Sequence, residues 1–164
     1  KNVPFLLNSN IVMFVLTKNT YENYSAAFGL TYRDRYGTIY IDLKYTGNNN
    51  DISENATLHE LAHGWDNQYD LNYNIRLSGK NNMKNFYNSL TEEKRKNLSL
   101  SEWFAGLFTE WYWHYKGYDT SKPSYAGYKD SYSTNEKNCA AKLFNCYTNS
   151  ANNNYKTSCD NISC

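Results

Sequence analysis

The sequence predicts an α+β fold in which a small N-terminal mixed sheet precedes a mainly helical C-terminal half. Two observations support this prediction: strand-like segments are confined to the first part of the chain, and segments with helical periodicity follow them. The 164 residues contain no internal repeat and no interdomain linker, and a chain of this length can bury its own core. We therefore expect residues 1–164 to form one domain with a cysteine-containing C-terminal tail.

The N-terminal part contains three strand-like segments, residues 11–16, 30–35 and 38–45. The first is a continuous apolar run of strand length, and Gly37 separates the other two. In the third, apolar Ile39, Ile41 and Leu43 alternate with other residue types, which predicts one apolar face and a half-exposed strand. A helix is expected over residues 20–28, between the first two strands.

The C-terminal part reads as a series of helices, several of them opened by a residue that can cap a helix N-terminus. The expected helices are one that begins after Asp51 or Ser53 and ends near Tyr69, one over 83–90, a short one capped by Thr91, an aromatic one over 102–115 capped by Ser99 or Ser101, and a last one over 136–147. Residues 70–82 are expected to be irregular, and residues 116–134 to form a polar loop.

The composition argues against some classes of partner. With 17 Lys and Arg against 16 Asp and Glu, the net charge is +1, so nothing indicates binding to nucleic acid or to a membrane surface. No apolar run reaches the length of a membrane-spanning helix. The chain begins at Lys1 without a signal peptide, which we interpret as a mature or excised domain, and we expect it to be a monomer.

All four cysteines lie near the C-terminus, at Cys139, Cys146, Cys159 and Cys164. The lack of a C-x-x-C pair argues against a structural zinc knuckle. Their even number and their clustering at one terminus favour two disulfides and a secreted, extracellular protein, the alternative being reduced thiols in a cytosolic protein. Cys139 and Cys146 lie two turns apart on one helix face, which at about 1.5 Å per residue exceeds the roughly 7 Å Cα separation that a disulfide spans. An antiparallel return of the tail therefore favours the pairs Cys146–Cys159 and Cys139–Cys164.

The most informative segment is His59-Glu60-Leu61-Ala62-His63, within a predicted helix. Histidines at this spacing project from one face of a helix, so both imidazoles can bind one Zn²⁺ with Glu60 beside the open coordination position. Zinc needs a third protein ligand, which a later His, Asp or Glu can provide. The candidates are His114, Glu102 and Glu110, and Glu102 begins an otherwise apolar helix that can point it into a cleft.

These residues carry a family resemblance. The segment 58–66 together with Ser101-Glu102-Trp103-Phe104-Ala105 resembles the family that includes the anthrax lethal factor catalytic domain and the Pro-Pro endopeptidases of clostridia and bacilli. In that family His-Glu-x-x-His is followed, at a similar distance, by Glu-aromatic-Phe-Ala, whose Glu is the third zinc ligand. The resemblance covers these two segments and implies a zincin-like fold of the gluzincin type.

The resemblance also implies a role for each matched residue. His59, His63 and Glu102 would bind Zn²⁺, which lowers the pKa of a coordinated water toward about 7. Glu60 would be the general base that takes a proton from this water. Asp66 matches the family's Asp after the second His, lies on the same helix face, and could orient an imidazole as a hydrogen-bond acceptor.

The motifs leave the residue that stabilises the oxyanion open. The family has a Tyr upstream of the third ligand, where this chain has Arg95, and often a second Glu one turn after it, where this chain has Gly106. We consider Tyr87, His114 and Arg95 itself for this role, Arg95 through its positive charge.

The motifs together predict a secreted zinc metalloendopeptidase, and the family implies a role in toxicity or virulence. A peptide or protein substrate is expected to add to strand 38–45, interpreted as an edge strand above the cleft, the alternative being an ordinary inner strand. A second interpretation is a catalytically degenerate domain of the same fold that binds a protein partner, because fold does not determine function.

Overall fold

A computed structural model of the chain describes residues 11–16, 29–35, 38–44, 50–115, 131–152 and 158–164. The elements in chain order are the strands β1 (Ile11–Leu16), β2 (Gly29–Arg33) and β3 (Ile39–Lys44), followed by the helices α1 (Asn50–Tyr73), α2 (Asn81–Ser89), α3 (Glu92–Arg95), α4 (Leu100–Tyr115) and α5 (Thr134–Asn152). The fold is mixed α+β and mostly helical, as predicted. The predicted helix over 20–28 and most of the predicted loop over 116–134 lie outside the described residues.

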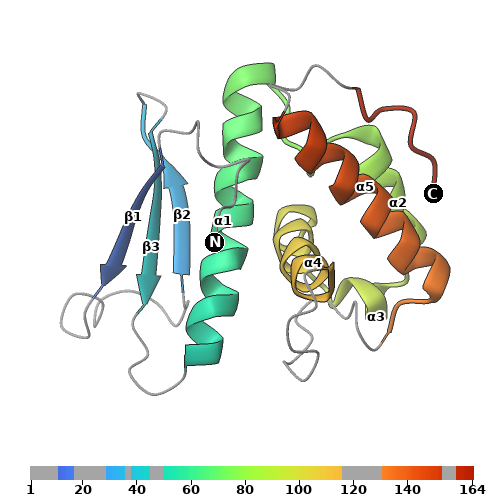
Figure 1. The fold of residues 1–164 in the computed structure, drawn as a ribbon, viewed down its shortest axis with the longest axis horizontal. Coiled ribbons are helices and arrows are strands. Elements are labelled where there is room, and N and C mark those ends of the chain that lie inside the picture. Colours follow the sequence, from blue (N-terminus) through green and yellow to red (C-terminus); the bar gives the residue numbers. More distant parts are fainter. Residues whose placement is uncertain (1–10, 17–28, 36–37, 45–49, 116–130, 153–157) are drawn as a thin grey trace.

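Helix α1 lies between two layers. Figure 1 shows the three strands on one side of α1 and helices α2 to α5 on the other. α1 packs against β2 and β3 on the sheet side and against α4 on the helical side. On the sheet side, Leu61 of α1 contacts the buried side chains of Ile39 and Ile41 in β3. The histidine-containing segment of α1 is therefore placed between the sheet and the helical layer.

The sheet is mixed, with the strand order β1-β3-β2. β1 pairs with β3 in parallel, and β2 pairs with β3 antiparallel, so that Thr31 lies opposite Ile41. The interpretation of residues 38–45 as an edge strand is therefore wrong, because β3 has a neighbouring strand on each side. The apolar alternation at Ile39 and Ile41 arises because α1 covers one face of the sheet. A central strand and an edge strand both show such alternation when one face of the sheet is covered.

α1 extends one turn beyond its predicted end near Tyr69. Its buried stripe has helical spacing and consists of Leu58, Ala62, Trp65 and Tyr69. The helix ends at Tyr73, after which Asn74 adopts a left-handed conformation with a φ of 54°, which Asn tolerates better than most residues. The stretch 70–82, predicted to be irregular, thus contains the last turn of α1 and the beginning of α2.

Serine and threonine caps define the beginnings of the later helices. Ser99 rather than Ser101 caps α4, because its Oγ accepts a 3.3 Å hydrogen bond from the backbone N–H of Glu102. Thr91 caps α3 as predicted, accepting from the N–H of Lys94. α5 begins with a reciprocal capping box in which the N–H of Ser133 donates to the Glu136 carboxylate and the N–H of Glu136 donates to Ser133 Oγ.

An aromatic core joins α1, α4 and α5. The large apolar side chains of α4 that are buried are Trp103, Phe104, Leu107, Phe108 and Trp111. Phe104 and Phe108 both pack against Trp65 of α1 and against Phe144 of α5. These ring contacts fix the position of α4 relative to the other two helices.

The C-terminal tail is attached to α5 by two disulfides. Cys139 pairs with Cys164, with a Cα separation of 5.3 Å, and Cys146 pairs with Cys159, with a Cα separation of 5.9 Å. Both predicted pairings are confirmed. Within the part of the chain that is described, no helix has the length and apolarity needed to cross a membrane.

Candidate metal centre

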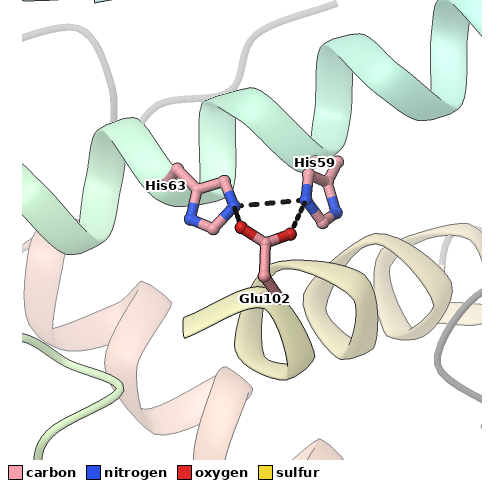
Figure 2. Close-up of side chains that lie close together, drawn as sticks. All are labelled: His59, His63 and Glu102. Carbon is pink, nitrogen blue, oxygen red and sulfur yellow. Dashed lines mark hydrogen bonds and ion pairs between the residues drawn. The ribbon is translucent and has the colours of Figure 1, made fainter. Parts of the chain in front are cut away.

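Three predicted metal ligands meet where α1 and α4 face each other. His59 and His63 project from one side of α1, and Glu102 projects toward them from the first turn of α4 (Figure 2). The Nε2 atoms of the two histidines lie 3.1 Å apart. Oε2 of Glu102 lies 3.2 Å from Nε2 of His59, and Oε1 lies 3.3 Å from Nε2 of His63. Glu110 and His114, the other candidates for third ligand, lie further along α4 and do not belong to this group.

Helix geometry and core packing together produce this arrangement. The spacing of His59 and His63 puts their side chains one turn apart on α1, about 6 Å along the axis. Glu102 lies at the beginning of α4, next to residues that enter the aromatic core. Phe104 of α4 packs against Trp65 of α1. Phe104 follows Glu102 by two residues, and Trp65 follows His63 by two residues. The contact that joins the helices therefore also places the carboxylate opposite the imidazoles.

The donor set fits a tetrahedral metal ion. Two imidazole nitrogens and a carboxylate form the ligand sets of catalytic zinc sites that keep an open fourth position. At metal–ligand distances of about 2.0–2.1 Å, neighbouring ligand atoms of a tetrahedron lie about 3.3 Å apart. The two Nε2 atoms are 3.1 Å apart, and each lies at a similar distance from a different oxygen of Glu102, 3.2 Å for His59 and 3.3 Å for His63. All the ligand atoms lie within 4.8 Å of one another, so this group could hold a metal ion.

The charge of Glu102 complements the two imidazoles. Hydrogen bonds from His59 and from His63 hold the pKa of the Glu102 carboxyl far below its ordinary value of 4.5, although partial burial acts in the opposite direction. The side chains of His59 and His63 are only 16% and 13% exposed, whereas that of Glu102 is 47% exposed. The imidazoles are thus shielded, and the group is open to solvent on the side of the carboxylate.

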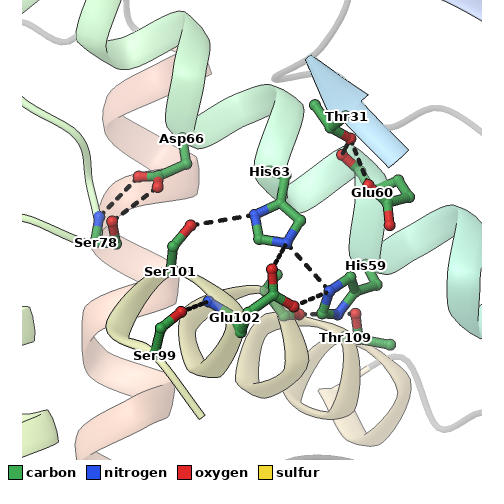
Figure 3. Close-up of polar contacts among 11 residues, drawn as sticks. Thr31, His59, Glu60, His63, Asp66, Ser78, Ser99, Ser101, Glu102 and Thr109 are labelled. Carbon is green, nitrogen blue, oxygen red and sulfur yellow. Dashed lines mark hydrogen bonds and ion pairs between the residues drawn. The ribbon is translucent and has the colours of Figure 1, made fainter. Parts of the chain in front are cut away.

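Glu60, the predicted general base, is buried and turns toward the sheet. Its Oε2 accepts a 2.6 Å hydrogen bond from Oγ1 of Thr31 on β2 (Figure 3). Only 7% of the residue is exposed. No described residue forms a hydrogen bond with Oε1, which leaves that oxygen able to accept a proton.

The second nitrogen of His63 contacts Ser101 rather than Asp66. Oγ of Ser101 lies 3.3 Å from Nδ1 of His63. Asp66, predicted to orient an imidazole, instead accepts two 2.8 Å hydrogen bonds from Ser78, one from its N–H and one from its Oγ (Figure 3). Asp66 is 1% exposed, and its burial raises the pKa of the carboxyl, although both bonds from Ser78 oppose this shift. Asp66 therefore anchors the segment that joins α1 to α2.

The described contacts do not bring the three oxyanion candidates to the metal ligands. The hydroxyl of Tyr87 donates to the backbone oxygen of Leu98 at 2.7 Å. The guanidinium of Arg95 lies over the ring of Tyr87, 4.9 Å from its centroid. His114 lies at the opposite end of α4 from Glu102, about 18 Å along the helix axis at the usual helical rise.

The sequence did not indicate three residues that contact the site or its neighbours, Thr31, Ser78 and Ser101. Thr31 precedes Glu60 by 29 residues, and only the packing of β2 against α1 brings the two together. Ser78 lies in a segment whose path depends on how α1 ends. For Ser101 the sequence holds a signal, since it directly precedes Glu102, but the same position also fits a helix cap.

In comparisons with known proteins, no family model, no curated protein and no solved structure matches the chain.

Proposed function

We propose that the protein is a zinc metalloendopeptidase, an enzyme that hydrolyses peptide bonds. The observation that carries this proposal is the convergence of His59, His63 and Glu102, with Glu60 next to His59 on the same helix. The resemblance of the two motifs to the lethal-factor-like and Pro-Pro endopeptidases supports the same activity on a zincin-like fold of the gluzincin type. The two disulfides support a secreted protein, which we propose acts as a single monomeric domain.

Each residue of the site has a place in this chemistry. Zinc, when bound, would supply a Lewis acid for the scissile carbonyl and an activated water at neutral pH. His59 and His63 would hold it through Nε2, and Glu102 through its carboxylate. Glu60 would accept a proton from the attacking water at Oε1, since Thr31 occupies Oε2. The same oxygen would then donate that proton to the leaving amine nitrogen, so that Glu60 ends each turnover ionised.

We further propose that an extended peptide substrate pairs with β2. β3 is excluded because β1 and β2 occupy both of its sides, whereas β2 pairs with one strand among the described residues. An edge strand offers backbone N–H and C=O groups to which an extended peptide can add. β2 also contacts Glu60 through Thr31, so a peptide on this strand would lie beside the general base.

Metal analysis combined with peptide cleavage tests this function. We expect the purified protein to bind zinc and to cleave members of a peptide library, and we expect a chelator to abolish cleavage until zinc is restored. Glu60→Gln should retain zinc and lower kcat by about 10²- to 10⁴-fold, the contribution of general base catalysis. Glu93→Gln, which changes an exposed carboxylate on α3, is the control and should alter neither property. A Glu60→Gln variant that cleaves as well as the wild type would show that the general-base assignment is wrong.

A second candidate function is a protein-binding module on the same fold. The contacts of Tyr87 and Arg95 favour it, because they hold both residues against other parts of the chain rather than against the metal ligands. A folded sample that binds no zinc and cleaves no peptide would favour this module over the peptidase.

A further inference from the structure

Thr31 on β2 contacts Glu60 on α1 at two points. Its Oγ1 lies 2.6 Å from Oε2 of Glu60 and 3.0 Å from the backbone oxygen of the same residue (Figure 3). A hydroxyl carries one hydrogen, and both neighbours are acceptors. The hydrogen belongs to the shorter contact, because 2.6 Å lies well within the usual range of an O–H···O hydrogen bond, whereas 3.0 Å lies at its upper limit. Thr31 therefore donates to Oε2.

The sheet and a second strand–helix contact determine where this hydroxyl lies. Thr31 pairs across the sheet with Ile41, a buried residue of the central strand β3. Arg33 follows two residues later and so projects from the same face of β2, where it donates to Asp70 of α1 at 3.0 Å. β2 is thus attached to α1 at two places, and these contacts hold the backbone of Thr31 next to Glu60.

We propose that Thr31 is a positioning residue that orients the general base Glu60, an inference that rests on the proposed function. The hydrogen bond holds Oε2 toward the sheet and so fixes the orientation of the carboxylate. In this orientation Oε1 is the oxygen that accepts the proton. Without the hydroxyl, the Glu60 side chain can rotate, and a displaced base transfers protons less efficiently. Because Thr31 belongs to the proposed docking strand, it also connects the bound peptide to the base.

Removal of the hydroxyl at constant side-chain shape tests this role. In Thr31→Val we expect kcat to fall by about 10- to 100-fold, which is less than the full contribution of a general base, while KM and bound zinc stay at their wild-type values. Thr31→Ser retains the hydroxyl and should restore kcat. Thr31→Ala is a second hydroxyl-free variant and should repeat the loss. All rates are expressed per folded, zinc-loaded molecule, measured by circular dichroism and metal analysis.

Asp70→Asn is the matched control for the attachment of β2 to α1. It weakens the other strand–helix contact, at Arg33, about 15 Å along the helix from Glu60. We expect Asp70→Asn to lower the melting temperature and to leave kcat unchanged. An equal loss of kcat in Asp70→Asn and Thr31→Val would show that Thr31 acts only by attaching the strand, and would overturn the inference. A raised KM with wild-type kcat in Thr31→Val would also overturn it, because the role would then be in peptide docking.

Failure of this inference can be distinguished from failure of the proposed function. A wild-type protein that cleaves no peptide, or whose cleavage survives Glu60→Gln, removes the general base and with it any role of Thr31. Cleavage that depends on Glu60 but is unaffected by Thr31→Val and Thr31→Ala leaves the proposed function intact and rejects the positioning role alone.

Discussion

The hydroxyl of Ser101 lies 3.3 Å from Nδ1 of His63 and joins the first turn of α4 to α1. Nε2 of His63 faces Glu102, so Nδ1 is the nitrogen that would carry the hydrogen and donate it to Ser101 when a metal ion binds. Such a bond keeps the ring in one tautomer and one orientation. With a metal ion bound, the dipeptide Ser101-Glu102 would thus supply one ligand and orient another.

We expect Ser101→Ala to weaken zinc binding by about 10- to 100-fold, the usual effect of removing a hydrogen-bond partner of a metal-bound imidazole. Competition with a chromophoric chelator measures this affinity. Ser89→Ala, which removes a hydroxyl of α2 that donates to Phe86, is the control and should leave zinc affinity unchanged. Equal zinc affinities of Ser101→Ala and the wild type would contradict the role of this contact.

Asp66→Asn is expected to act on stability rather than on zinc. The substitution puts an amide group where Asp66 accepts two hydrogen bonds from Ser78 in a fully buried position. The mismatch should reduce the free energy of unfolding by about 1–3 kcal/mol, as measured by urea denaturation. Zinc affinity of the folded variant should remain that of the wild type. Loss of zinc affinity at full stability would instead favour the imidazole contact that the sequence suggested for Asp66.

Removal of the Cys146–Cys159 disulfide should destabilise the helical half. The bond closes a loop with a sequence separation of 13 residues, and loops of this size correspond to about 3 kcal/mol of stability in the chain-entropy model. Urea denaturation of a Cys146→Ser/Cys159→Ser double variant measures this loss. The wild type treated with a reductant provides a comparison and should lose at least as much, because both disulfides open. A double variant as stable as the oxidised wild type would contradict this expectation.

Acid should remove a contribution from Glu136, which joins α5 to α3. Burial alone would raise the pKa of this carboxyl, but the 2.7 Å contact with Lys94 and the bonds from Ser133 hold it below its ordinary value of 4.5. A carboxyl whose pKa is lower in the folded than in the unfolded state stabilises the protein at pH values above its unfolded-state pKa. This stabilisation is lost as the pH falls through the folded-state pKa. Glu136→Gln should therefore melt below the wild type at pH 7, and the difference should shrink as the pH falls below about 4. A difference that does not change with pH would contradict the ion pair.

Local patterns were sufficient for much of this protein. The spacing of His59 and His63 indicated one helix face, and both histidines point to the same place in the structure. The spacing of Cys139 and Cys146 on α5 excluded a bond between them and left the tail as their partner, which is what the structure contains. These predictions succeeded because the geometry of a helix depends only on nearby residues.

Predictions that depended on neighbours from other elements were less successful. Alternation in residues 38–45 indicated that one face of the strand is covered, but it carries no information about the strands beside it, and β3 is central. Asp66 lies on the same helix face as His63, yet its partner is Ser78, because the segment after α1 turns back over that face. The end of α1 was also missed, because it depends on the left-handed conformation of Asn74.

By itself, the sequence determined that the fold is α+β, that His59 and His63 share one helix face, and that Cys139 and Cys146 cannot pair with each other, because these properties follow from patterns within single elements. The tertiary structure alone decided that β3 is central, that Ser101 rather than Asp66 contacts His63, and that Thr31 contacts Glu60. Those contacts join residues that are far apart in the sequence. They form only because α1 packs between the sheet and α4, with apolar side chains buried on both sides, and no local pattern specifies that packing.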